Sequence, residues 1–198
     1  MQLILVRHGV PARADGLRDP GLGVEGREQV DALVADWQHQ RIDAVWSSTM
    51  QRAVETAELL ADPRGLSVRQ HEGLSELAHD GPYVPLEDTE HPTVTAFWER
   101  IAQQANDPVI QGFRRCVVAA IDDVIHASGP EDVVVIACHG GVISAYASAV
   151  LGLEKVLFFV GDYAGYSRFD VDSAGAATMV SLNEHGHLLA LAAKRGSG

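Results

Sequence analysis

The chain has 198 residues, of which 46% are hydrophobic and 21% are charged, and its formal net charge is −12 at pH 7. These proportions exclude a disordered, collagen-like or coiled-coil chain, and the length fits a single domain over residues 1–198. The negative charge argues against nucleic acid or an anionic membrane as the main partner, so a site for an anionic ligand must gather its own local positive charge.

No segment of the sequence predicts export or membrane insertion. The N-terminus, MQLILVRHG, has an apolar run too short for a signal peptide and no basic residues before it. No run approaches the roughly 20 apolar residues of a membrane span. Cys116 and Cys138 each lie in an apolar run, so we interpret them as small core residues rather than as a disulfide or a metal site. We therefore expect a soluble, cytoplasmic protein.

The first half of the chain alternates strand and helix patterns. Residues 2–7 (QLILVR) are almost all apolar, which predicts a central strand covered on both faces. A loop rich in Gly, Pro and Asp follows, and apolar residues then recur at helical spacing over residues 24–40. A second strand is predicted at 42–48 (IDAVWSS) and a second helix at 49–61. The predicted limits of these helices are an N-cap at Gly23, an N-cap at Thr49 and a stop at Pro63.

The second half continues the same alternation. A short strand at 66–74 leads into the irregular stretch HDGPYVPLEDTEHP, residues 79–92. The elements predicted after it are helix 93–105, helix 112–127, strand 133–138 (VVVIAC) and helix 142–151. In the tail, β-rich runs separated by Gly and Asp predict strands at the sheet edge: VLFFV (156–160), YSRFDV (166–171) and TMVSL (178–182). The whole pattern predicts an α/β fold with a mostly parallel sheet.

Two of the predicted strands end in matching motifs. LILVRHG ends at Arg7-His8-Gly9, and VVIACHGG ends at His139-Gly140-Gly141. Ligands of open α/β sheets collect at the carboxyl ends of the strands, so we expect the two histidines to face each other across a crevice. The glycines after them allow a backbone to approach a ligand closely, and the amides of the helix that starts near Gly141 suit an anion. Either histidine alone is as well explained as a loop residue, but two such strand ends favour a site.

Two further residues are candidates for this site. Arg52 lies at the start of the helix after the second strand, where its planar guanidinium could hold a phosphoryl group. Glu76, in GLSEL, could protonate a leaving oxygen and later activate water. The alternatives are a surface arginine paired with Glu55 and a solvated loop glutamate. His71 and His79 flank Glu76, but no histidine shows a metal-ligand spacing, and we expect no metal or other cofactor.

The sequence resembles the histidine phosphatase superfamily, which has the phosphoglycerate mutase-like fold. Five segments match its motifs in the family's order: VRHG (6–9), DPGLGVEGREQV (19–30), VWSSTMQRAVETA (45–57), GLSEL (73–77) and ACHGGVI (137–143). LNEHGHL near the end resembles the family's closing stretch. The resemblance implies a three-layer α/β/α sandwich with a mostly parallel central sheet.

The resemblance also implies a role for each matching residue. His8 would be the nucleophile that forms a phosphohistidine, and Glu76 would donate a proton to the leaving alcohol and take one from water. The groups that would bind the phosphoryl oxygens are Arg7, Gly9, Arg52, His139 and Gly140. The chemistry needs no metal. The implied partner is a small phosphorylated substrate, without nucleic acid or membrane, and the resemblance allows a homodimer.

The sequence departs from the family at three positions that could touch substrate. Val10 and Pro11 replace the polar residues that often follow RHG, and Gly23 replaces a hydroxyl residue. The stretch with which mutases bind phosphoglycerate is absent, which favours a phosphatase. Two alternatives stay open: a mutase that returns the phosphoryl group to its substrate, and a catalytically silent module that binds phosphorylated ligands.

Specificity is expected to reside in two irregular segments near the strand ends, residues 10–22 and 79–92. Tyr163 and Tyr166 of the tail are predicted to come close to the pocket. Arg13 and Arg18 could add charge for a polyanionic substrate, but the favoured interpretation is that they are solvated loop residues.

Overall fold

The computed structural model describes residues 1–13, 18–77, 96, 99, 101–102 and 105–196. Within these ranges six strands form one sheet in the order β3-β2-β4-β1-β5-β6. The strands are β1 (Gln2–Arg7), β2 (Ala44–Ser47), β3 (Val68–Gln70), β4 (Val133–Cys138), β5 (Tyr166–Val171) and β6 (Ala177–Glu184). The four strands from β3 to β1 are parallel, and β5 and β6 are antiparallel. The sheet is mostly parallel, as predicted, with the last two strands at its edge.

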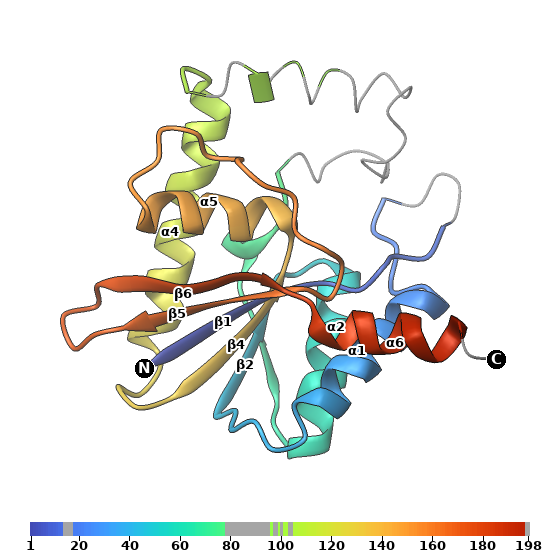
Figure 1. The fold of residues 1–198 in the computed structure, drawn as a ribbon. Coiled ribbons are helices and arrows are strands. Elements are labelled where there is room, and N and C mark those ends of the chain that lie inside the picture. The colour runs from blue at the N-terminus through green and yellow to red at the C-terminus, as the bar shows by residue number, and fades with distance from the viewer. Residues whose placement is uncertain (14–17, 78–95, 97–98, 100, 103–104, 197–198) are drawn as a thin grey trace.

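Helices cover both faces of this sheet (Figure 1). The α-helices of the described ranges are α1 (Val24–Asp36), α2 (Gln51–Ala61), α4 (Pro108–His126), α5 (Gly140–Val150) and α6 (Gly186–Gly196). Two short 3₁₀ helices, η1 (Asp62–Arg64) and η2 (Glu72–Leu74), follow α2 and β3. Because α4 and α5 lie on one face and α1, α2 and α6 on the other, the predicted three-layer sandwich is confirmed. None of the described helices has the length and apolar character needed to cross a membrane.

The two apolar layers explain why β1 reads as a continuous hydrophobic run. Leu3 and Leu5 point into the core under α4 and α5, whereas Ile4 and Val6 point into the core under α1 and α2. All four side chains are fully buried. A strand with helices on both faces has no solvent side, so its sequence loses the alternation of a half-exposed strand.

The register of β1 against β4 brings the two histidine motifs together. Arg7 pairs with Cys138, the last residue of β4, and the amide of His8 donates to the Cys138 carbonyl at 3.0 Å. The strands therefore end at the same level of the sheet, and His8 and His139 leave it side by side. β2 ends at this edge too, because Ser47 pairs with Ala137.

Two predictions about local structure were wrong. Met50, not Thr49, is the N-cap of α2, and the Thr49 hydroxyl lies 3.3 Å from the hydroxyl of Ser75 instead. Residues 156–160 (VLFFV) do not form a strand. The side chains of residues 156–159 pack against the core under α4 and α5, whereas Val160 is exposed. The hydroxyl of Ser144 on α5 donates to the carbonyl of Val156 and accepts from the amide of Phe158. A segment that packs against helices needs the same run of apolar residues as a buried strand, so the sequence pattern does not distinguish the two.

Predictions about the cysteines and about the helices also differ from the structure. Cys116 is exposed, not a core residue, because it lies off the buried face of α4, whereas Cys138 is fully buried in β4. α6 was not predicted at all. The helices predicted at 112–127 and 142–151 exist but begin earlier, at Pro108 and Gly140. The helix predicted at 93–105 lies largely outside the described residues.

Candidate active site

His8 follows β1 directly, and its ring is held by hydrogen bonds at both nitrogens. Nδ1 lies 2.8 Å from the carbonyl oxygen of Gly9, which can only accept, so Nδ1 carries the hydrogen. In the neutral ring the lone pair is therefore on Nε2, which accepts from Nε of Arg52 at 3.1 Å. This geometry presents an unprotonated Nε2, the atom that a nucleophilic histidine needs.

The surroundings of His8 favour this neutral form. Its residue exposure is only 4%. Burial, and then the nearby guanidinium groups of Arg52 and Arg7, hold the pKa of His8 well below its ordinary value, against a smaller opposing effect of the Gly9 carbonyl. A cation beside a buried imidazole disfavours adding a second positive charge. The side chain is thus neutral at pH 7.

Arg7, the last residue of β1, is 7% exposed. One terminal nitrogen, Nη1, donates to the carbonyl of Gly161, and the guanidinium carbon lies 3.6 Å from the centroid of the Tyr163 ring. No acceptor among the described residues pairs with its Nε, which is buried. A buried donor of this kind is costly unless an acceptor reaches it, so Arg7 has capacity left for an anion.

Arg52 is the second residue of α2 and is 3% exposed, which contradicts the alternative of a surface arginine. Besides Nε on His8, its Nη1 donates to Asp19 Oδ1 at 3.3 Å. The other oxygen of Asp19 accepts from the amide of Gln51, at the N-terminus of α2, at 2.8 Å. Asp19 was not predicted as a site residue. It opens the matching segment 19–30, but its role becomes visible only when the folded loop brings it to Arg52.

His139 is the N-cap of α5 and is fully buried. Its ring centroid lies 5.1 Å from that of His8 in an edge-to-face arrangement, so the predicted pair of facing histidines is present. Nε2 of His139 lies 2.8 Å from the hydroxyl of Ser48, which directly follows β2. Ser48 was not predicted as a site residue, although the sequence pattern places it at the end of the second predicted strand, at the same sheet edge as His139.

Glu76 lies against the N-terminus of α5. Its Oε2 accepts from the amide of Gly141 at 3.0 Å, and its Oε1 accepts from the amide of Leu77 at 2.9 Å. A Cβ at position 141 would lie 2.1 Å from Oε1, so only glycine leaves room for this carboxylate. The amides at the start of α5 were expected to bind an anion. In this structure the carboxylate of Glu76 occupies that place. Glu76 is half-buried and bonded to two backbone amides, which disfavours the alternative of a solvated loop glutamate.

The predicted glycines have separate structural reasons. A Cβ at Gly9 would lie 2.4 Å from the carbonyl oxygen of Gly26, because the strand end packs directly on α1. The amide of Gly9 donates to Thr56 at 3.3 Å. Gly140 lies beside Arg7, with its Cβ position 3.6 Å from Nε. A side chain at position 140 would therefore make an ordinary contact with Arg7, on the side where Nε lies.

The residues that depart from the family contact α1 and the loop before it. The amide of Val10 donates to the side chain of Gln29 at 3.0 Å, and Pro11 forms an isolated bridge with Leu22. Gly23 is the N-cap of α1, as predicted, and its amide donates to the Val10 carbonyl at 2.9 Å. These contacts tie the segment to α1.

The structure places the two tyrosines and two arginines considered above in different surroundings. The ring of Tyr163 lies 5.5 Å from that of His8, which confirms its place at the pocket. Tyr166 was predicted wrongly: it is buried against Trp37 at 4.8 Å and donates to Glu184. Arg13 and Arg18 are exposed. The specificity segment 79–92, together with His79, lies outside the described residues.

His71, the other histidine near Glu76, belongs to a different contact. Its Nδ1 accepts from the amide of Gly73 at 3.1 Å, and its Nε2 lies 3.3 Å from Asp123 Oδ2 on α4. In the part of the chain that the structure describes, no group of three or more His, Cys, Asp or Glu side chains could hold a metal ion.

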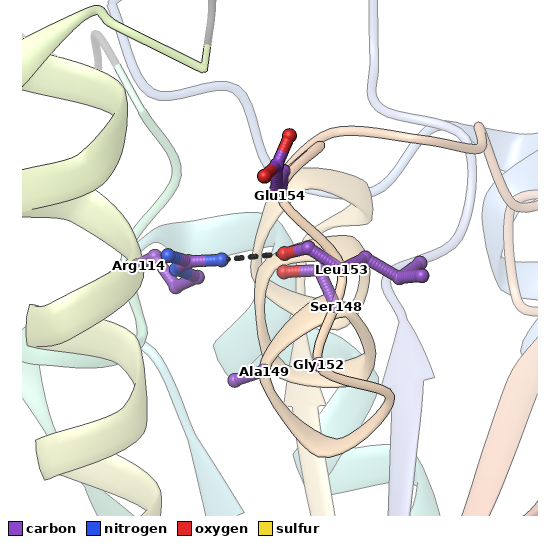
Figure 2. A pocket seen from close by; sticks show the side chains of 6 residues that line it. All are labelled: Arg114, Ser148, Ala149, Gly152, Leu153 and Glu154. Atoms are coloured by element: carbon purple, nitrogen blue, oxygen red, sulfur yellow. Dashed lines mark hydrogen bonds between the residues drawn. The ribbon is translucent and has the colours of Figure 1, made fainter.

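A hollow away from the histidines lies between α4 and the end of α5 (Figure 2). Its one arginine, Arg114, points across the hollow and donates to the carbonyl of Leu153 at 2.8 Å and to the side chain of Gln111 at 2.8 Å. The guanidinium thereby joins α4 to the turn after α5, and we assign this hollow a structural role.

Comparison with known proteins identifies the family of the chain. The family model of the histidine phosphatase superfamily (branch 1) matches residues 3–185. Phosphoserine phosphatase 1 of Hydrogenobacter thermophilus is 27% identical over 181 residues, covering 84% of this chain and 85% of that protein. Glucosyl-3-phosphoglycerate phosphatase of Mycolicibacterium vanbaalenii is 28% identical over 202 residues, covering 89% of each.

Solved structures share the fold. YhfR of Bacillus stearothermophilus superposes with a TM-score of 0.78 at 21% identity, covering 94% of this chain and 98% of that chain. Phosphoserine phosphatase of Entamoeba histolytica superposes with a TM-score of 0.74 at 20% identity, with the same coverage. The family match extends over nearly the whole sequence and includes every residue of the site described above. The chain belongs to branch 1 of the histidine phosphatase superfamily.

Proposed function

We propose that this protein is a phosphatase that hydrolyses a small phosphorylated substrate through a phosphohistidine on His8, without a metal. Both curated relatives are named as phosphatases, one for phosphoserine and one for glucosyl-3-phosphoglycerate. The observation that carries the mechanism is the hydrogen-bonding of His8, with Nδ1 on a backbone carbonyl and Nε2 facing Arg52.

In the first half-reaction, Nε2 of His8 attacks phosphorus. The N–P bond forms as the P–O bond to the leaving alcohol breaks, and Glu76 in its acid form gives its proton to that oxygen. Arg7, Arg52 and His139 hold the three non-bridging oxygens and stabilise the charge of the transition state. Before attack, Arg52 must release the Nε2 lone pair, and a phosphoryl oxygen is the acceptor that replaces it.

In the second half-reaction, water attacks the phosphohistidine. Glu76, now a carboxylate, takes a proton from this water as the new O–P bond forms and the N–P bond breaks. The products are inorganic phosphate and neutral His8, with Glu76 again in its acid form. The backbone amides of Leu77 and Gly141 hold the carboxyl group in place for both proton transfers.

The test is turnover of p-nitrophenyl phosphate together with chemical trapping of the intermediate. Wild-type protein should release phosphate and, after an acid-free quench, carry an acid-labile phosphoryl group that His8→Ala lacks. His71→Ala is the matched control, because His71 pairs with Asp123 outside the site. A His8→Ala variant that keeps wild-type turnover would contradict the mechanism, and isomerised substrate with little free phosphate would indicate the mutase alternative. The expected homodimer stays a prediction that light scattering can test.

A further inference from the structure

The segment 161–165 contacts the side chain of Arg7 from two directions. The carbonyl of Gly161 accepts from Nη1 of Arg7, within the plane of the guanidinium. The ring of Tyr163 covers a face of the same group, with 3.6 Å between the guanidinium carbon and the ring centroid. A planar cation held at its edge and on its face has its orientation set.

The same segment also holds the backbone from which Arg7 and His8 project. The amide of Arg7 donates to the carbonyl of Gly165 at 2.9 Å, and the amide of Ala164 donates to the carbonyl of His8 at 3.2 Å. The strand end at the active site is therefore held between β4 on one side and this segment on the other.

The segment 161–165 lies in the connection between α5 and β5, and one of its residues has an unfavourable backbone conformation. Ala164 has a φ of +57°, in the left-handed region that residues with a side chain seldom adopt. A conformation of this kind persists only where surrounding contacts determine it.

Asn183, near the end of β6, supplies such contacts. Its Oδ1 accepts from the amide of Asp162 at 2.8 Å, and its Nδ2 donates to the Asp162 carboxylate at 2.9 Å. The amide of Asn183 donates to the hydroxyl of Ser167 at 3.1 Å. This hydrogen bond fixes Asn183, on β6, relative to Ser167 on β5. Asn183 also has a positive φ, +54°, a conformation that asparagine tolerates better than most residues.

The two glycines of the segment fit around this side chain. A Cβ at Gly165 would lie 2.7 Å from Oδ1 of Asn183, and one at Gly161 would lie 3.1 Å from the same atom. The amide therefore sits in a space that larger residues on either side of Asp162 would close. Both the shape and the hydrogen bonds of the segment are matched to Asn183.

We propose that Asn183 is a positioning residue of the phosphoryl site: by fastening Asp162 it holds residues 161–165 against Arg7 and His8. This inference rests on the role assigned to Arg7 and His8 under the proposed function. Asn183 touches neither residue in any contact described above, so it acts through the segment.

The test is a swap of the two side chains. Asn183→Asp places two carboxylates 2.9 Å apart where an amide met a carboxylate, and it should loosen the segment. We expect kcat for p-nitrophenyl phosphate to fall, and the inhibition constant of inorganic phosphate to rise, each by about tenfold or more. The double variant Asp162→Asn/Asn183→Asp restores one amide and one carboxylate, and it should return both quantities to within about threefold of wild type.

Two further variants keep the test sharp. Asn183→Gly retains the left-handed backbone without the amide and should show the same loss of phosphate affinity, even if Asn183→Asp does not fold. Asp172→Asn is the matched control, because Asp172 accepts from two amides in the turn at the far end of β5 and β6. Its kinetics should match wild type.

Wild-type phosphate affinity in Asn183→Gly, or a swap variant that folds but does not recover, would overturn the positioning role. A wild-type protein that neither turns over the aryl phosphate nor binds inorganic phosphate would instead contradict the proposed function itself.

Discussion

The guanidinium Nε of Arg52 lies 3.1 Å from Nε2 of His8 and donates a hydrogen bond to it. In the proposed reaction the same cation binds the group that Nε2 attacks. The contact thus keeps the nucleophile unprotonated before substrate arrives, and the incoming phosphoryl oxygen takes over the donor. Arg52 thus contacts first the nucleophile, Nε2 of His8, and then the phosphoryl group that it attacks.

Removing this guanidinium should damage catalysis severely. Arg52→Gln is expected to lower kcat/KM for p-nitrophenyl phosphate by about 10²- to 10³-fold, because a donor aimed at developing charge is lost from a buried site. Arg52→Lys keeps the charge without the planar fork and should recover only part of the loss. Arg41→Gln is the control, since Arg41 is exposed and pairs with Asp43 before β2. A loss below about threefold in Arg52→Gln would contradict the assignment.

The low pKa of His8 predicts an acid limb at lower pH than an ordinary histidine would give. Attack requires neutral His8, so kcat/KM should hold as pH falls through about 6.5 and decline only below it. Because Arg52 contributes to the lowering of the pKa, Arg52→Gln should move this limb to higher pH. Profiles of both proteins with one substrate cancel the ionisation of the substrate itself. An unchanged limb would mean that another group controls it.

The same shift has a consequence for stability. The unfolded chain binds a proton on His8 at an ordinary pKa of about 6.5, whereas the folded chain resists it until lower pH. The contribution of neutral His8 to the free energy of unfolding is therefore complete above that pH and is lost as pH falls toward the folded-state pKa. His8→Ala should show a weaker dependence of the urea midpoint on pH over this range, measured beside His71→Ala.

Most of the architecture follows from local sequence patterns. β1 and β4 have the predicted bounds because both are buried on two faces and end sharply at a histidine and a glycine. Residues 156–160 failed because burial against helices and burial in a sheet select the same apolar residues. α6 begins after a turn in a tail whose β-rich runs dominated the prediction.

The candidate site likewise contains residues that local patterns predict and residues that they do not. His8 and His139 could be paired because two similar strand ends predict a common sheet edge. For Arg52 and Glu76, the resemblance to a family favoured the roles in the site over the alternatives of surface or loop residues. Asp19, Ser48 and Asn183 were missed because each contributes through a contact with a residue at least 20 positions away. No local pattern marks such a contact before the fold is known.

The two cysteines provide a direct check of the fold. Cys116 is exposed on α4, whereas Cys138 is fully buried in β4, where burial raises the pKa of its thiol. Native protein should therefore react with one equivalent of Ellman's reagent, and the second thiol should react only on unfolding. Cys116→Ser should abolish the fast reaction. Two fast thiols in native protein would contradict the burial of β4.

The closeness of Gly141 to Glu76 predicts a defect that depends on the leaving group. Gly141→Ala places a methyl group 2.1 Å from the present position of Oε1 of Glu76, so the carboxyl group must move. Protonation matters most for a poor leaving group, so we expect kcat to fall by about 10²-fold for an alkyl phosphate and much less for p-nitrophenyl phosphate.

Glu76→Gln should reproduce this dependence, because it removes the proton while keeping the shape of the side chain. Gly186→Ala is the matched control, since Gly186 also begins a helix but a Cβ there meets nothing within 4 Å. Equal losses for both substrates in Gly141→Ala would show that the methyl group disturbs phosphate binding rather than proton transfer. Equal losses for both substrates in Glu76→Gln would instead move the role of proton donor away from Glu76.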